Sequence, residues 1–427
     1  MDFFQKLGSL VTRLWKERDY DEEDFPEVAS RGLSELPPDQ HISLWDVTKW
    51  ALTCEQLPAQ ADLRAKFGQP PLTVYNGRDF RIEVLFWVQG VPAIHQHSFS
   101  GVFHVMHGSS LQCLWDFEAT EELAIRLALG RVSLKKAELL RKGDSRPIVA
   151  GRQMIHSTFH LDRPSLTVVV RTLGEIDKLP QYSYLPPTIA YAQDHDVPSV
   201  QRRAQLLRML LISRKRAEYN EIARHILGTE DAYSVFQFLF STFEMIEGED
   251  ERHDLLLAAR LKHPKLIEAL LPALLQVERR NKIVGIRERV SNSDLQFFLA
   301  LLLNIPERPA ILSLIEQRYP SRDPINAVVS WVRELSEMGV LGVRFNKPWL
   351  SLLQCLLMNL SEEEICQTFS NEYAGYRAAD LELGLHELSS AFRDSWLLQP
   401  VFSSKDLGSG MQRLTTVSQS RSTAMSN

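Results

Sequence analysis

The stretch WVQGVPAIHQH, residues 87–97, is the most informative part of the chain. It ends in a histidine pair, His95 and His97, after the turn residues Gly90 and Pro92. In a β-strand, side chains two positions apart point to the same face, about 6–7 Å from each other. Two imidazoles at that spacing can converge on one ion, at the roughly 2 Å metal–nitrogen distances of zinc-type sites. The spacing also fits two surface or capped histidines, so the pair alone leaves both interpretations open.

The segments around this pair are predicted to be β-strands, because they are rich in Val, Ile, Phe, Trp and Thr and are bounded by turn residues. Many short strands in succession indicate an antiparallel barrel or sandwich. Two segments between them, residues 119–130 and 133–144, have helical spacing and are expected to be helices beside the barrel. Residues 179–187 are expected to be a proline-bounded connector. The predicted strands cover residues 72–75, 80–88, 101–108, 110–117, 152–160 and 165–173.

The histidine pair belongs to a longer pattern. Residues 87–97 have the form W-x-x-G-x-P-x-I-H-x-H and resemble the first metal motif of cysteine dioxygenase-type cupins. The next predicted strand ends at Gly108, as that motif does. The second cupin motif supplies one more histidine from a later strand, and His156 matches it. The resemblance covers residues 72–190 and implies a β-barrel with a metal on His95, His97 and His156.

In the family, the barrel holds an iron on three histidines and binds a thiol amino acid and dioxygen. The resemblance therefore implies Fe(II) as the cofactor, with Zn, Ni or Mn not excluded. Three neutral imidazoles would leave open metal positions for a chelating substrate and dioxygen.

The sequence departs from the family at several positions. Gly101 stands where the general motif has a glutamate, and Gly101 and Val102 lie near the position of a crosslinking cysteine. Thr167 and Val169 replace a histidine and a tyrosine. These departures weigh against free cysteine as the substrate.

His160 is a candidate catalytic residue because it follows His156 by four positions, which in a strand is the same face. It could act as an acid–base group or face the substrate. The alternative is an exposed histidine at the strand end.

Arg171 is the second candidate catalytic residue, because a substrate carboxylate favours an arginine. If residues 161–164 form a hairpin loop, His156 pairs with Val169, and Arg171 lies one diagonal step from His156. A surface arginine is the alternative. Arg81 and Arg152 are weaker candidates for the same role, and Arg152 would lie about 13 Å from His156 along the strand.

The fold class predicted is α+β: an antiparallel cupin-type β-barrel preceded by short helices and followed by a large all-α domain. The domains expected are a helical segment, 1–71, a metal-binding barrel, 72–190, and a helical domain, 195–402. Residues 403–427 are rich in Ser, Thr and Gly and are expected to be disordered.

The composition excludes some classes of partner. The formal net charge of −6 weakly repels nucleic acid and anionic membranes, so neither is an expected partner. The N-terminus lacks the apolar core of a signal peptide, and no apolar run reaches about 18 residues. The four cysteines form no C-x-x-C pair and indicate reduced thiols. A cytoplasmic protein is expected.

Two functions follow as hypotheses. The first is a metal-binding, non-haem iron dioxygenase that acts on a small thiol or amino-acid-like substrate together with dioxygen. The second is a non-catalytic or sensory metal-binding cupin whose helical domain binds a protein or peptide partner. The helical region carries no catalytic motif, and a docking surface there is inferred from its size alone.

Overall fold

The computed structural model describes residues 1–60, 68–88, 93–174, 181–192, 198–342, 344–372, 392 and 395–402. The expected disordered tail and residues 89–92 of the first histidine motif lie outside these ranges. The chain divides into two compact units, Met1–Glu278 and Arg279–Asn427. The expected domain boundaries, with a helical segment at 1–71, a barrel at 72–190 and a helical domain at 195–402, stay predictions.

The first unit contains two antiparallel sheets. One is an open sheet with the strand order β1-β2-β9-β4-β7. Its central strand β9 pairs with β2 along the whole length of β2, from Phe80 to Trp87. The strands of this sheet are β1 (Pro71–Asn76), β2 (Phe80–Trp87), β4 (Gly101–His107), β7 (Ser145–Ile148) and β9 (Ser165–Thr172).

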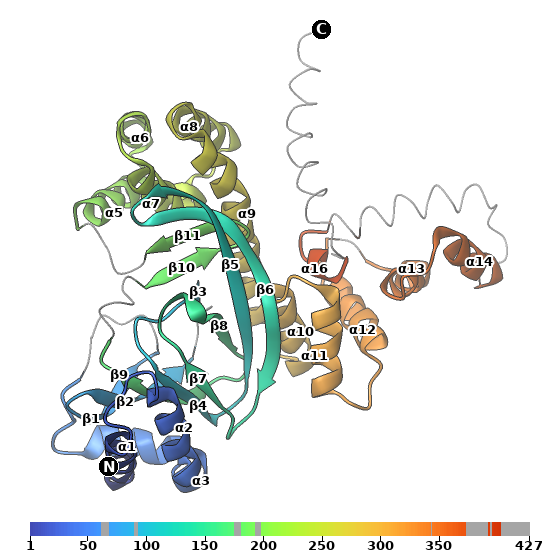
Figure 1. Ribbon diagram of the computed structural model, residues 1–427. Coiled ribbons are helices and arrows are strands. Elements are labelled where there is room, and N and C mark those ends of the chain that lie inside the picture. Colours follow the sequence, from blue (N-terminus) through green and yellow to red (C-terminus); the bar gives the residue numbers. More distant parts are fainter. Residues whose placement is uncertain are drawn as a thin grey trace. The chain divides into compact units, whose positions relative to one another are not determined.

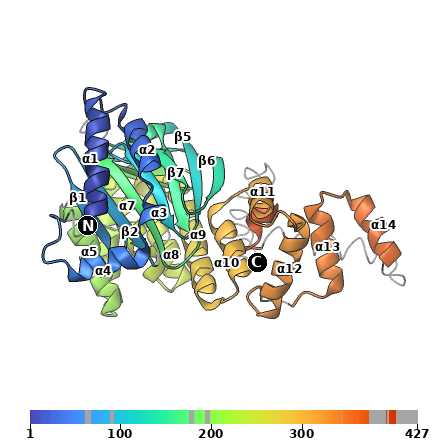
Figure 2. The same cartoon turned by 90° about the horizontal axis from the view of Figure 1, so that it is seen from below.

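One face of the open sheet is apolar and packs on the N-terminal helices. Ile82, Val84 and Val168 are fully buried there, in one cluster with Phe4 and Leu7 of α1. Figures 1 and 2 show α1 and α2 lying over this sheet. The opposite face is therefore left for the interior between the two sheets. The helices are α1 (Asp2–Lys16), α2 (Phe25–Glu35), α3 (Pro38–His41) and α4 (Leu44–Thr53).

The second sheet is a closed barrel with the strand order β10-β11-β6-β5-β8-β3. Pairing between Ser183 of β10 and His95 of β3 closes the ring. The strands are β3 (Ile94–His95), β5 (Ser110–Ala124), β6 (Leu127–Leu140), β8 (Ile155–His160), β10 (Tyr182–Leu185) and β11 (Ile189–Ala192). A 3-10 turn, η1 (Gly151–Gln153), leads into β8.

The two helices predicted for residues 119–130 and 133–144 were wrong. Most of these residues lie in β5 and β6, which pair as one long curved hairpin (Figure 1), and residues 141–144 form the turn after β6. The pairing register shifts between Leu114 and Trp115, between Ala119 and Glu121, and between Glu122 and Ala124. Each shift breaks the two-residue alternation of a strand. The interrupted alternation imitates the three-to-four-residue spacing of a helix.

Two further local predictions were wrong. Residues 182–185 of the expected connector form strand β10, and β11 follows it. The expected hairpin between the strand of His156 and the strand of Arg171 does not form. β8 pairs with β5 and β3, whereas β9 pairs with β2 and β4, so the two strands belong to different sheets.

Helices follow the barrel strands. In the first unit, the outer face of the barrel at Leu127 and Ile189 shares a core with Phe236 and Leu239 of α7. The helices that follow β11 in the sequence are α5 (Pro198–Ile212), α6 (Arg216–Thr229), α7 (Ala232–Thr242), the 3-10 turn η3 (Phe243–Met245), α8 (Glu249–Lys262) and α9 (Pro264–Arg289), and the boundary between the two units falls within α9.

The second unit is helical throughout its described residues. Its helices are α10 (Ser293–Asn304), α11 (Arg308–Arg318), α12 (Pro324–Glu337), α13 (Lys347–Leu357), α14 (Glu362–Glu372) and α16 (Gln399–Phe402). A search of the described helices finds none with the length and apolar character needed to cross a bilayer. The chain is therefore α+β, with a closed antiparallel barrel that follows short N-terminal helices and precedes a large helical region in the sequence, as predicted.

Candidate metal centre

The structure brings His95, His97 and His156 together. His95 and His156 are opposite each other in the pairing of β3 with β8. The Nε2 atoms of His97 and His156 are 2.8 Å apart, and one ring nitrogen of each of the three residues lies within 4.8 Å of the others. Such a group of nitrogens is compact enough for a single ion of the zinc or iron type.

Strand β10 fixes the backbone that carries the first two histidines. Gln96 lies between them and points the other way, where Tyr184 donates a 2.6 Å hydrogen bond to its Oε1 atom. The backbone N–H of Gln96 donates a hydrogen bond to the backbone carbonyl oxygen of Tyr182. After β3, the chain is held by a bridge between His97 and Ala150. The alternation of a strand thus aims both imidazoles at one point.

Burial keeps the three imidazoles neutral. The exposed fractions of His95 and His156 are 4% and 5%. Burial lowers the pKa of His95, and it lowers the pKa of His97 and His156 well below the usual value. Each histidine charge would also repel the others, and Arg171 lowers the pKa of His97 further. Neutral imidazole is the form that binds a metal.

The hydrogen bonding of the rings fits a metal site. His95 Nδ1 lies 2.9 Å from the carbonyl oxygen of Ala93 and donates to it, which directs its Nε2 atom to the group. The Nδ1 atoms of His97 and His156 are buried and have no hydrogen-bond partner among the described residues. Buried polar atoms are rarely left in this state. The donor set therefore suits a divalent metal that favours imidazole, such as Fe or Zn.

Arg171 is near this group, although not through the predicted hairpin. Its guanidinium carbon lies 4.1 Å from the ring centre of Phe99, and the Phe99 ring is 4.4 Å from that of His97. Glu83 of β2 is the cross-strand partner of Val169 of β9, and it forms a 3.1 Å ion pair with Arg171. Arg171 therefore faces the interior across from the barrel sheet.

Two arginines share the single carboxylate at this end of the interior. Arg81 is the cross-strand partner of Arg171 and lies 3.6 Å from Glu83. Burial lowers the pKa of Arg171 to about 10, a change that Glu83 opposes and Arg81 reinforces. Arg171 therefore stays charged at neutral pH, and two arginines against one carboxylate give this group a net positive charge, with Arg171 on the side near His97. Glu83 was not singled out from the sequence, because a lone glutamate in a strand usually faces solvent.

His160 lies on the same face of β8 as His156, at the far end of the strand. Its ring is stacked on Trp87 at a centre distance of 4.3 Å, and its Nδ1 atom is 3.0 Å from the Ser110 hydroxyl. Burial lowers its pKa to about 3, so it is neutral at physiological pH. His160 thus lines the interior at the other end of β8 and is not adjacent to the three histidines.

The two positions that depart from the family also face the interior. Thr167 accepts a 2.9 Å hydrogen bond from Trp87 Nε1. Val169 packs with Phe103 in an apolar cluster that includes Leu140 of the barrel. Neither side chain can exchange a proton near neutral pH.

His104 points outward, as strand alternation predicts. It is buried beneath the N-terminal helices, 3.0 Å from Asp39 of α3 and 2.9 Å from the Ser145 hydroxyl. Its ring nitrogens are therefore used to attach α3 to the open sheet.

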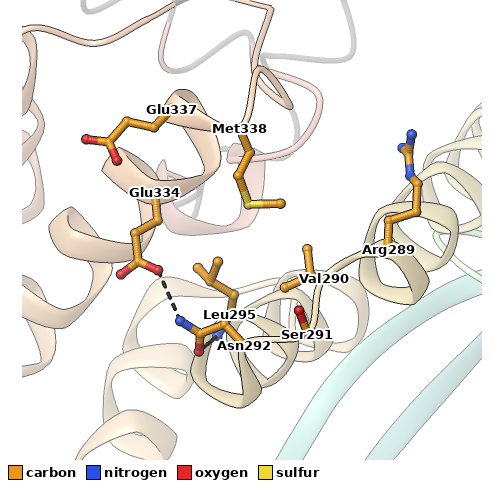
Figure 3. A pocket seen from close by; sticks show the side chains of 8 residues that line it. All are labelled: Arg289, Val290, Ser291, Asn292, Leu295, Glu334, Glu337 and Met338. Atoms are coloured by element: carbon orange, nitrogen blue, oxygen red, sulfur yellow. Dashed lines mark hydrogen bonds between the residues drawn. The ribbon is translucent and has the colours of Figure 1, made fainter.

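The second unit has a concave site of its own, shown in Figure 3. Its volume is about 380 Å³, and Figure 3 shows Glu334 of α12 directed at Asn292 across it. Asn292 donates a 3.1 Å hydrogen bond to Glu334. The residues that line it include neither histidine nor cysteine, so they offer no group of the kind found in the barrel.

Comparisons with known proteins give little beyond the fold. No protein-family model matches the chain, and no curated protein matches its sequence. Several solved structures match about a quarter to a third of the chain. One is hydroquinone 1,2-dioxygenase from a Sphingomonas species, with 13% identity, 26% of this chain and 68% of that chain covered, and a TM-score of 0.21.

Two others are a variant of oxalate decarboxylase from Bacillus subtilis and an uncharacterised protein with a double-stranded β-helix domain from Klebsiella pneumoniae. The first has 16% identity, covers 24% of each chain and has a TM-score of 0.18. The second has 15% identity, covers 32% of this chain and 100% of that chain, and has a TM-score of 0.18. With such low scores, the assignment of the fold depends on the strand pairing of this chain itself.

Proposed function

We propose that this chain is a metal-binding cupin protein that holds one divalent metal, most suitably Fe(II), on His95, His97 and His156. We further propose that it is a dioxygenase of a small thiol or amino-acid-like substrate. The observation that carries the proposal is the convergence of three neutral imidazoles. His95 and His156 are buried and face each other across β3 and β8, and the half-buried His97 lies just beyond β3. The resemblance of residues 87–97 to cysteine dioxygenase-type cupins supports the reaction class.

The roles of the chain's own residues follow from their positions. The three histidines bind the metal and leave its other positions open. Arg171 binds an anionic group of the substrate, since it belongs to a cluster with net positive charge beside His97. His160 and Trp87 bound the substrate at the other end and exclude water from it. Bound iron would supply the site for substrate chelation and dioxygen activation.

The neutral state of His160 limits what it can do. A histidine with a pKa of about 3 is neutral at neutral pH, so it lacks the second proton that a general acid would transfer. In the tautomer whose Nδ1–H donates to the Ser110 hydroxyl, the Nε2 atom can accept a hydrogen bond. Its proposed role is thus to orient a donor group of the substrate.

The departure at Thr167 and Val169 favours a second candidate, a sensory or non-catalytic metal-binding cupin whose helical region binds a protein or peptide. A metal without redox activity, such as Zn, would distinguish it. In that case metal binding would persist without any oxygen consumption.

Metal content is the test of the proposal. The untagged protein would be purified without oxygen beside a His95→Ala/His156→Ala double variant, and both would be analysed for metals. About one iron per chain, absent from a folded double variant, is expected. Oxygen uptake would then be measured with a panel of thiols and amino acids. Failure of the wild type to bind iron, zinc, nickel or manganese on reconstitution would overturn the metal site.

A further inference from the structure

A row of side chains leads away from the three histidines along one face of the barrel. In the antiparallel pairing of β5 with β8, Leu114 is opposite His156, Gln112 is opposite Thr158, and Ser110 is opposite His160. Side chains directly opposite each other share a face, as do alternate residues along a strand. Gln112 and Thr158 therefore lie on the face of His156, between it and His160.

Contacts at both ends show that this face points toward the other sheet. At one end, His160 is stacked on Trp87, which belongs to β2 of the open sheet. At the other end, His156 meets His97, and His97 contacts Phe99, which lies in an apolar cluster with residues of the open sheet. Gln112 and Thr158, in the middle of the row, are directed into the same interior.

These two side chains have unused hydrogen-bonding capacity. Gln112 is only 1% exposed, and its Oε1 atom has no hydrogen-bond partner among the described residues. The Oγ1 atom of Thr158, opposite it, is buried in the same state. The neighbouring polar side chains already have hydrogen-bond partners, since His160 is hydrogen-bonded to Ser110, and Trp87 to Thr167. A buried acceptor without a partner destabilises a fold, so its presence here indicates a partner that binds.

The chemistry of the two atoms defines that partner. An amide oxygen only accepts hydrogen bonds, whereas a hydroxyl accepts and donates. Two carboxylates lie near this region, and both already have cationic partners. Glu138, the cross-strand partner of Gln112 on β6, is paired with Arg146 and Lys136. Glu83 is paired with Arg171 and Arg81, so neither carboxylate is free to hold a further cation. A neutral O–H or N–H group is therefore the appropriate ligand. Thr158 is two residues from His156, which corresponds to roughly 7 Å along a strand.

We propose that Gln112 and Thr158 form a subsite for a neutral hydrogen-bond donor of the substrate, a hydroxyl or amide N–H, about two strand positions from the metal-binding group. This inference rests on the proposed function and extends it. The substrate is then longer than cysteine, with a metal-binding end and a neutral polar group further along. The loss of the family's histidine and tyrosine at Thr167 and Val169 agrees with a different substrate.

The test uses the full chain loaded with cobalt(II), whose absorption reports both metal binding and thiol ligation. Two thiols of equal length are titrated: mercaptobutanol, which ends in a hydroxyl, and pentanethiol, which ends in a methyl group. The wild type is expected to bind mercaptobutanol about five- to tenfold more tightly, as one added hydrogen bond implies. The short pair, mercaptoethanol and propanethiol, is expected to show no such preference.

Variants connect the preference to the two residues. Gln112→Met and Thr158→Val should abolish it, whereas Thr158→Ser, which keeps the hydroxyl, should retain it. Equal or tighter binding of pentanethiol by the wild type would overturn the subsite, as would bound cobalt that no thiol reaches. Failure to bind cobalt at all would instead refute the proposed metal site.

A ligand-free measurement gives an independent answer. Valine has the shape of threonine without its hydroxyl, so Thr158→Val removes only the group in question. If that hydroxyl has no hydrogen-bond partner in the ligand-free protein, the midpoint of thermal unfolding of the variant should be unchanged or higher. A lower midpoint would mean that an internal partner, such as an ordered water, already binds the hydroxyl, and the subsite would be refuted.

Discussion

His95 and His156 are direct cross-strand partners, and the pair is the point at which β3 meets β8. Two of the three proposed metal ligands are thereby placed by backbone pairing between strands that lie far apart in the sequence. The third, His97, follows by alternation along the same short stretch. The geometry depends on the barrel as a whole and not on a single loop.

His156→Ala should abolish metal binding while the barrel remains folded. Metal would be quantified after dialysis against limiting iron or zinc, beside circular dichroism. The loss of affinity should exceed the roughly 10- to 100-fold that is typical when only a residue supporting a ligand is removed. His107→Ala is the matched control, because His107 is exposed at the end of β4. Full metal occupancy in folded His156→Ala would contradict the assignment.

Tyr184→Phe should weaken the metal site without touching a ligand. The variant removes the 2.6 Å hydrogen bond to Gln96, the residue between His95 and His97. A net loss of about 1 kcal/mol corresponds to roughly fivefold weaker metal affinity, measured by competition with a chelator. Tyr182→Phe, on the same strand, is the control, since its hydroxyl makes only a 3.4 Å exposed contact with the carbonyl oxygen of Ile125. Equal effects of the two variants would argue against a positioning role for Tyr184.

Arg171→Gln should reduce affinity for anionic thiols specifically. A hydrogen bond to a charged group contributes about 1.5–3 kcal/mol, so mercaptopropionate should bind roughly ten- to a hundredfold more weakly. Mercaptoethanol, which has no carboxylate, should bind as before. Glu83→Gln frees Arg171 from its ion pair and should keep or increase the affinity for mercaptopropionate. The role of Arg171 would be refuted by equal losses for both thiols.

His160 should make the protein less stable in acid. Its folded-state pKa of about 3 lies below the ordinary value of 6.5, because burial disfavours the charged ring. The unfolded chain binds a proton more readily, so the contribution of His160 to stability is complete above about pH 6.5 and is lost as the pH falls toward 3.

His160→Phe keeps a ring to stack on Trp87 and removes this titration. The free energy of unfolding, measured by urea denaturation at several pH values, should then fall less steeply between pH 6.5 and 4 than in the wild type. Parallel curves for the two proteins would contradict the burial of a neutral His160.

Much of the barrel could be predicted, because its strands have strong local signals. The predicted strands at 80–88, 101–108 and 165–173 each match an observed strand to within one residue at either end. The long hairpin of β5 and β6 could not be recognised, since its bulges disturb the alternation on which the prediction depends. Strand β10 was missed because prolines surround it.

The candidate site was predictable only in part. The H-x-H spacing and the later histidine indicated the group that the structure brings together. Residues two positions apart in a strand point to the same face whatever the pairing register of that strand. The position of Arg171 was reached by a wrong argument, the hairpin between β8 and β9, and the two sheets bring it to the interior by facing each other.

Glu83, Gln112 and Thr158 gave no signal in the sequence. Alternation separates the two faces of a strand, but it does not show which face is inside. In β2, the apolar face at Ile82 and Val84 packs on helices, so the polar face with Glu83 is the one that lines the interior. Only the helices outside the sheet settle this, and they are remote in the sequence.

The brevity of β3 has a consequence for how the barrel holds together. A strand of two residues, Ile94 and His95, closes the ring between β8 and β10, and it pairs with β8 at one position only. This junction between β3 and β8 has fewer paired residues than the other strand pairs of the barrel. An ion bound by His95 of β3 and His156 of β8 would crosslink the two strands at this junction. Metal binding at the proposed site would thus stabilise the closed barrel, and amide hydrogen exchange in β3 and β8 would slow with the metal bound.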